Sequence, residues 1–251
     1  MKPRNLPAID ARYWTAILAA SMCGANTGDF ASRILGLGHT RGLLPLALVF
    51  LVIVWAEKRS KIATEAYYWL AIIVLRTGAT NLADLGTHDL KLGYFLCMGL
   101  LVALIVAMLL IDQARGVEPI GVAGPDGRWR LLPATDASYW VTMLAAGTLG
   151  TAAGDWVAEE AGLGLYFGSV VLVGVLIVVW FTSDQYGKMT KPWYWLTIVA
   201  ARTAGTTLGD LLASRRGLGL GLVVSTICTS LLLAGIVILW RDRSAARLRE
   251  V

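Results

Sequence analysis

The sequence predicts an all-α integral membrane protein with eight transmembrane helices, arranged as four parallel two-helix repeats that form two pseudo-symmetric halves. Three observations predict this fold. Of the 251 residues, 57% are hydrophobic and only 16% are charged, whereas a soluble protein carries about a quarter of charged residues. Many apolar runs approach the roughly 20 residues that a helix needs to cross a bilayer. Four segments also repeat one pattern. This composition excludes a soluble enzyme, a disordered chain and a secreted disulfide scaffold.

The apolar runs define the eight expected spans in order. They cover residues 13–34, 42–56, 66–87, 92–112, 137–158, 163–182, 193–213 and 218–240. An even number of spans places both termini on one side of the membrane. Fifteen Lys and Arg residues, including the basic tail from Arg241 to Arg249, fall on that side, and five fall on the other. The positive-inside rule therefore predicts cytoplasmic termini.

Tryptophans are expected to mark the same inner interface. Seven of them fall at the inner ends of the spans: Trp14, Trp55, Trp69, Trp140, Trp180, Trp195 and Trp240. Indole rings concentrate at the headgroup level of membranes. We therefore expect these side chains to form an interfacial belt.

The internal repeat is the strongest signal in the sequence. Four segments align without a gap: YWTAILAASMCGANTGDF, YWLAIIVLRTGATNLADL, YWVTMLAAGTLGTAAGDW and YWLTIVAARTAGTTLGDL. An aspartate lies fifteen residues after each tryptophan, at Asp29, Asp84, Asp155 and Asp210. A Leu-Gly pair follows each aspartate, the fourth being Leu218-Gly219.

The repeats divide the chain into two halves. The first half covers residues 1–113, a cytoplasmic linker covers 114–136, and the second half with its basic tail covers 137–251. All four aspartate helices are odd-numbered spans and run in the same direction. The repeats are therefore parallel, related by an axis along the membrane normal, and the four aspartates are expected at one depth in the outer half of the membrane.

These stretches resemble a family of bacterial membrane proteins defined by a tandem repeat of unknown function. That family has four repeats, each with two transmembrane segments and a characteristic Trp. The resemblance covers about residues 13–240 and rests on TLGTAAGDW, RTAGTTLGD and the Leu-Gly after each Asp; the first repeat departs from it, with CGANTGDF. The resemblance implies the bacterial inner membrane and supplies no activity.

The aspartates are the main candidate site, because an ionisable group inside a membrane is costly and usually functional. Positions three and four residues before an aspartate share its helical face. These positions supply oxygen atoms from Asn26, Asn81, Thr80, Thr151 and Thr206. Carboxylate, hydroxyl and amide oxygens suit hard cations such as Mg²⁺, Mn²⁺ or Ca²⁺. A structural reading, in which the aspartates cap helices at the outer interface, remains open.

Two arginines are the other charges inside the predicted spans. Arg76 and Arg202 lie eight residues before Asp84 and Asp210. We expect them to pair with aspartates of neighbouring units and to tune the charge of the site. Small residues one and five positions before each aspartate, such as Gly150 and Gly154, are typical of close helix packing.

We therefore expect a transporter or channel for an inorganic cation, most plausibly divalent, at a metal site formed by Asp29, Asp84, Asp155 and Asp210. The alternatives are an anion or small-molecule permease centred on Arg76 and Arg202, and an accessory protein without a substrate. An intramembrane aspartyl protease is disfavoured because no glycine lies three residues before any of these aspartates. We expect neither enzymatic activity nor a cofactor. The expected partners are the lipid bilayer and the cation, without nucleic acid, and the sequence leaves room for a homo-oligomer.

Overall fold

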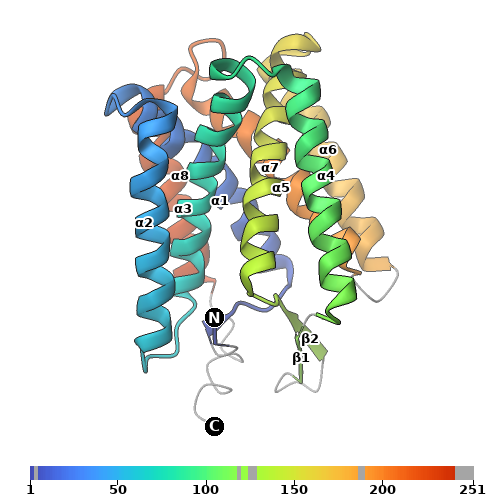
Figure 1. Ribbon diagram of the computed structural model, residues 1–251. Coiled ribbons are helices and arrows are strands. Elements are labelled where there is room, and N and C mark those ends of the chain that lie inside the picture. Colours follow the sequence, from blue (N-terminus) through green and yellow to red (C-terminus); the bar gives the residue numbers. More distant parts are fainter. Residues whose placement is uncertain (3–4, 118–119, 124–128, 186–189, 241–251) are drawn as a thin grey trace.

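The computed structural model describes residues 1–2, 5–117, 120–123, 129–185 and 190–240, and the tail from Arg241 to Arg249 lies outside this range. Eight long α-helices make up most of the described chain (Figure 1). They are α1 (Ala11–Asp29), α2 (Gly38–Arg59), α3 (Ala66–Asp84), α4 (Gly93–Ala114), α5 (Ala137–Asp155), α6 (Gly164–Gln185), α7 (Lys191–Ala213) and α8 (Gly221–Leu239). Every expected span corresponds to one of these helices.

Four inner helices form a closed ring. Helix α1 packs on α3, α3 on α5, α5 on α7, and α7 back on α1. The other four helices surround this ring, and each packs mainly on the inner helix that follows it in the chain: α2 on α3, α4 on α5, α6 on α7, and α8 on α1. The last contact joins the end of the chain to its beginning. Each unit is therefore held in place by the next one, and the ring has no free edge.

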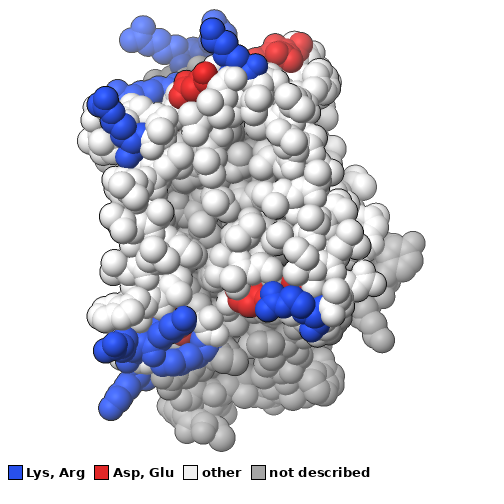
Figure 2. Space-filling view, viewed as in Figure 1, with Lys and Arg blue, Asp and Glu red and all other residues white. Residues whose placement is uncertain are grey.

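The outer helices carry the apolar surface. Helices α2, α4, α6 and α8 are long and apolar enough to cross a membrane, and most of their side chains are exposed. In the view of Figure 2, Lys, Arg, Asp and Glu gather toward the two ends of the molecule and leave an uncharged band between them. A large exposed apolar surface of this kind is typical of contact with lipid. The structure thus supports a membrane protein.

The two ends of the bundle differ. The first turn of α1 and the last turn of α8 lie together, and the Arg12 guanidinium donates to the Val237 carbonyl at 2.9 Å. We call this the termini end and the opposite one the cavity end. At the termini end Asn5 donates to the Glu57 carboxylate at 2.6 Å, and Arg12 pairs with Glu65 at 2.9 Å. These contacts tie the N-terminal segment across the ends of α2 and α3.

A small strand pair is the one departure from an all-α chain among the described residues. Strands β1 (Ile120–Ala123) and β2 (Trp129–Leu132) pair antiparallel within the segment that we expected to be a plain linker. The Leu131 carbonyl accepts a hydrogen bond from the Ile9 backbone amide at 2.9 Å. The segment between the halves is therefore attached to the N-terminal segment at the termini end.

Small residues allow the inner helices to approach closely, as the sequence indicated. A Cβ atom added at Gly150 would lie 2.6 Å from the Cβ of Arg202, and one at Gly154 would lie 3.1 Å from the Thr203 carbonyl oxygen. A Cβ at Gly28 would lie 2.7 Å from Thr80 Cβ. Backbones this close leave no room for a larger side chain, so these glycines determine the width of the ring.

The segments that follow the aspartates also repeat. Five-residue π-helical turns follow Asp29, Asp84 and Asp155, at η2 (Phe30–Ile34), η3 (Leu85–Asp89) and η4 (Trp156–Glu160). The fourth unit differs from the other three. Its helix α7 continues past Asp210 to Ala213 without a π-helical turn, and α8 begins at Gly221. The glycine that begins the outer helix in that unit is therefore Gly221 (φ +77°) and not Gly219 of the repeated Leu-Gly pair.

Candidate functional site

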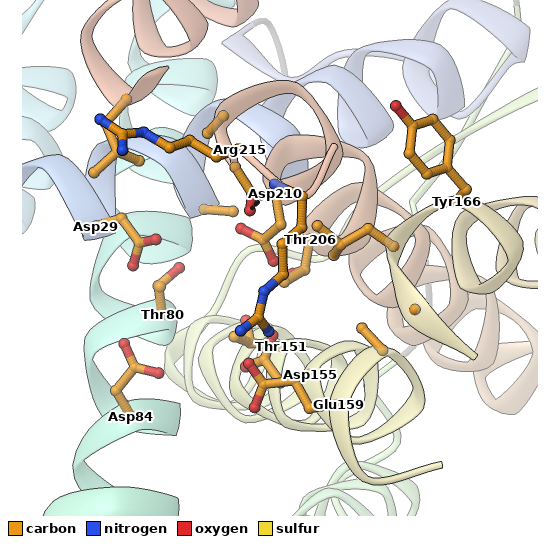
Figure 3. Close-up of a pocket in the computed structure, with 18 of the residues that line it drawn as sticks. Asp29, Thr80, Asp84, Thr151, Asp155, Glu159, Tyr166, Thr206, Asp210 and Arg215 are labelled. Carbon is orange, nitrogen blue, oxygen red and sulfur yellow. Dashed lines mark hydrogen bonds between the residues drawn. The ribbon is translucent and has the colours of Figure 1, made fainter. Parts of the chain in front are cut away.

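A polar cavity occupies the cavity end of the bundle. It has a volume of about 1100 Å³, and all four repeat-equivalent aspartates line it. Figure 3 shows the side chains of Asp29, Asp84, Asp155 and Asp210 around this space, each from a different inner helix. The structure thus brings together the four residues that the repeat predicted.

The position four residues before each aspartate also faces the cavity. It supplies Thr80, Thr151 and Thr206 from three units and Ala25 from the first. The position three residues before does not line the cavity. Asn26 is buried beside Gly209 of α7, and Asn81 is buried beside Gly42 of α2. The threonines thus form part of the cavity wall, with the Thr80 and Thr151 hydroxyls already bonded to Arg202, whereas the two asparagine amides lie at helix–helix contacts.

The aspartates lie where a negative charge is poorly tolerated without a cation. Asp29, Asp84 and Asp155 lie where their α-helices pass into the π-helical turns. The four side chains also lie near enough to repel one another electrostatically. A cation in the cavity would relieve this repulsion.

Two of the aspartates have basic neighbours. Asp29 Oδ2 lies 3.4 Å from Arg33 Nη1, and Asp84 Oδ2 lies 3.5 Å from His39 Nε2. The other nitrogen of His39 lies 3.0 Å from Asp89 Oδ2. No described Lys, Arg or His side chain forms an ion pair with Asp155 or Asp210. The second half of the chain therefore contributes the two carboxylates that are most available to a ligand.

The rim of the cavity contains further charged groups. Glu159 lines it and accepts a hydrogen bond from the Tyr94 hydroxyl at 3.1 Å. Arg33, Arg215 and Arg216 line it as well, together with His88. The five acidic residues of the lining exceed its three arginines by two. With all of these groups ionised, the lining has an excess of two negative charges.

The carboxylates surround the cavity and do not converge on one point. Among the described residues, no three His, Cys, Asp or Glu side chains gather closely enough to hold one metal ion. This geometry differs from the compact oxygen shell of a dehydrated Mg²⁺ or Ca²⁺ ion. The space suits a cation that keeps part of its water shell.

Arg202 lies beneath the threonines that line the cavity. Its side chain is fully buried and donates to four neutral oxygens. The acceptors are Thr151 Oγ1 at 3.0 Å, the Ser21 carbonyl at 2.6 Å, Thr80 Oγ1 at 2.6 Å and the Arg76 carbonyl at 3.2 Å. The expected ion pair with an aspartate is absent among the described residues, so that prediction was wrong. The guanidinium of Arg202, which belongs to α7, instead crosses the ring and binds acceptors on α1, α3 and α5. It therefore contacts all four units.

Arg76 is buried on the opposite helix of the ring. Its side chain has no exposed surface, and its Nη2 atom lies 3.7 Å from the sulfur of Met143. No hydrogen-bond acceptor in the described chain reaches its Nε or Nη1 atom. This arginine also forms no ion pair with a described carboxylate, contrary to expectation.

A ring of four tyrosines closes the bundle near the termini end. The hydroxyl of Tyr13 bonds to those of Tyr68 at 2.8 Å and Tyr194 at 2.5 Å, and the hydroxyl of Tyr139 bonds to the same two at 2.7 and 3.0 Å. All four residues are buried. Buried tyrosine hydroxyls need partners, and here the four repeat-equivalent groups satisfy one another.

The tryptophans beside these tyrosines are not interfacial. Trp14, Trp69, Trp140 and Trp195 are at most 8% exposed and pack edge-to-face on the ring of the preceding tyrosine. The expected belt is therefore wrong for these four residues, which belong to the core. Trp55 and Trp240 are exposed at the termini end.

The inner helices thus carry four successive layers. Counted from the tyrosine of each inner helix, the arginine layer lies eight residues along the chain, the threonine layer twelve, and the aspartates sixteen. At about 1.5 Å per residue, roughly 24 Å separates the tyrosines from the aspartates. The sequence analysis did not identify the tyrosine layer, although a tyrosine precedes each of the four repeated tryptophans.

One family model matches the chain. It is that of the Repeat of Unknown Function (DUF347), and it matches residues 12–63, 138–186 and 193–244. These stretches cover the first, third and fourth units, so the first repeat fits the family despite its divergent motif. No curated protein and no solved structure matches the chain. More than half of the residues are matched, and the chain therefore belongs to the Repeat of Unknown Function (DUF347) family.

Proposed function

We propose that this protein is a cation transporter of the bacterial inner membrane, with no enzymatic activity, in which all eight helices cross the bilayer. The cavity with its four repeat-equivalent aspartates carries this proposal. The inner helices contain polar groups that lipid would not tolerate, but the apolar outer helices surround them. The excess of basic residues at the termini end supports cytoplasmic termini, with the cavity open to the periplasm.

The substrate class follows from the lining of the cavity. Carboxylates and hydroxyls suit a hard inorganic cation. An excess of two negative charges matches one divalent cation. Because the carboxylates stand apart, we propose that the ion enters with part of its hydration shell and contacts Asp155 and Asp210 first, since these two have no basic partner among the described side chains.

The closed inner part of the bundle favours a carrier over an open pore. Arg202 crosses the axis beneath the threonines, and the tyrosine ring closes the bundle further in. A positive charge on the axis is a barrier to cations. Passage therefore requires the inner helices to rearrange. The anion permease is disfavoured because neither Arg76 nor Arg202 lines the cavity.

Flux in proteoliposomes tests the proposal. Purified protein is reconstituted and assayed against Mg²⁺, Mn²⁺, Ca²⁺, Zn²⁺, K⁺ and H⁺, with Asp155→Asn and Asp210→Asn as test variants. Glu160→Gln is the matched control, because Glu160 is exposed and does not line the cavity. We expect flux of one divalent cation that both Asp variants abolish and the control retains. Absence of flux for every cation in folded protein would contradict the proposal and favour an accessory role.

A further inference from the structure

Arg76 occupies a setting that a guanidinium alone does not tolerate. Its side chain is completely buried, and two of its donor atoms, Nε and Nη1, have no acceptor in the described chain. An arginine side chain stays protonated in proteins. A buried charge is costly unless it is paired and hydrogen-bonded.

The neighbouring groups do not supply the missing negative charge. Arg202 lies in the same layer and adds a second positive charge, and its Nη2 atom donates to the Arg76 carbonyl. Asp84 lies eight residues further along the helix, which is about 12 Å at 1.5 Å per residue. Side chains on a helix lean toward its N-terminus, so Arg76 is directed away from that carboxylate.

The tyrosine ring on the other side is neutral and already satisfied. Tyr13, Tyr68, Tyr139 and Tyr194 are the electrostatic neighbours of Arg76. Each hydroxyl has one proton, and four protons are enough for the four hydrogen bonds of the closed ring. The ring therefore offers the guanidinium no formal charge, and none of its oxygens accepts a hydrogen bond from Nε or Nη1.

The helix facing Arg76 approaches its unpartnered donors with a glycine. At the position equivalent to Arg76, α5 carries Gly147. A Cβ atom there would lie 3.4 Å from Arg76 Nη1. Any other residue at this position would therefore cover the atom that lacks an acceptor.

We propose that Arg76 binds a small monovalent inorganic anion, with chloride as its probe, between the arginine layer and the tyrosine ring. The anion accepts from Nε and Nη1 and offsets the charge of the two arginines. This site is separate from the cavity and does not depend on cation transport. The bound anion is a resident counter-ion of the closed core rather than a transported substrate.

Bromide locates the site directly. Crystals of the wild-type protein grown in sodium bromide should show an anomalous peak within hydrogen-bond distance of Arg76 Nε or Nη1. No peak there, with ordered bromide at other positions or none, would overturn the proposal and would indicate water as the partner of Arg76.

Thermal unfolding in detergent gives a second readout. At constant ionic strength, replacing gluconate by chloride should raise the Tm of the wild type in a saturating manner. Arg76→Met should lose this dependence, while Arg41→Gln, which removes an exposed arginine outside the cavity lining, should keep it. An equal Tm of the wild type in both salts would contradict the site. Neither experiment measures cation flux, so their failure is distinguishable from failure of the proposed transport.

Discussion

The Nη2 atom of Arg202 on α7 donates a 2.6 Å hydrogen bond to the hydroxyl of Thr80, which lies on α3 at the opposite side of the inner ring. Helix α7 belongs to the second half of the chain and α3 to the first. The same guanidinium also binds Thr151 Oγ1 and the Ser21 carbonyl. One side chain thus links all four units on the axis, directly beneath the candidate cation cavity.

Arg202→Lys should therefore destabilise the protein. Lysine keeps the charge but has a single nitrogen, which cannot reach four acceptors on four helices. With the loss of at least two charge-assisted hydrogen bonds, we expect the free energy of unfolding to fall by about 2 kcal/mol. Thermal unfolding in detergent measures the change. Arg216→Lys at the exposed rim is the control, and an equal loss in both variants would contradict the central role of Arg202.

The tyrosine ring should act as the inner seal. Tyr68→Phe removes one hydroxyl and interrupts two of the four hydrogen bonds. We expect a stability loss of about 1 kcal/mol and an increased passive leak of ions through reconstituted protein. Tyr67→Phe is a matched control because Tyr67 lies outside the ring. A leak that is the same in Tyr68→Phe, Tyr67→Phe and the wild type would show that the ring does not seal the bundle.

Gly150→Ala should disrupt the ring of inner helices. The new methyl group would lie 2.6 Å from both Cβ and Cγ of Arg202, so α5 and α7 would have to separate. Overpacking of this kind costs about 1–3 kcal/mol. Gly174→Ala on α6 has open space around it and should be neutral or slightly stabilising, because alanine favours helix formation. Folding yield and Tm compare the two, and equal effects would contradict the close packing.

Chemical labelling of introduced cysteines tests which side of the membrane the cavity opens to. In a background in which Cys23, Cys97 and Cys228 are replaced, Ser214→Cys places a partly exposed thiol in the cavity wall. A membrane-impermeant thiol reagent added to intact spheroplasts should modify it. Lys61→Cys, at an exposed position between α2 and α3 at the termini end, should react only after the membrane is opened. The reverse pattern would place the cavity in the cytoplasm.

The sequence predicted the long helices and the gathering of the four aspartates because both depend on short-range periodic patterns. Apolar runs mark helices α2, α4, α6 and α8 directly, and the repeat places one aspartate on each inner helix. It also predicted the close packing at glycines such as Gly150. These features require no knowledge of which helices are neighbours in space.

Features that depend on contacts between units were missed or wrong. The arginines were expected to pair with aspartates, but a spacing of eight residues and the lean of helical side chains toward the N-terminus separate the two groups. The tyrosine ring requires four helices around one axis, and only the structure shows that arrangement. The tryptophans were assigned to the interface because of their position along the spans, whereas packing on the tyrosines buries four of them.

The measurement that tests the central claim most directly is cation flux through four single variants: Asp29→Asn, Asp84→Asn, Asp155→Asn and Asp210→Asn. If the aspartates form one site around a shared cavity, each variant should reduce the initial rate of flux at least about tenfold, which corresponds to about 1.4 kcal/mol, while Glu160→Gln retains the wild-type rate. Undiminished flux in all four variants, in protein shown to be folded, would contradict the account, because the cavity would then not be the route of the ion.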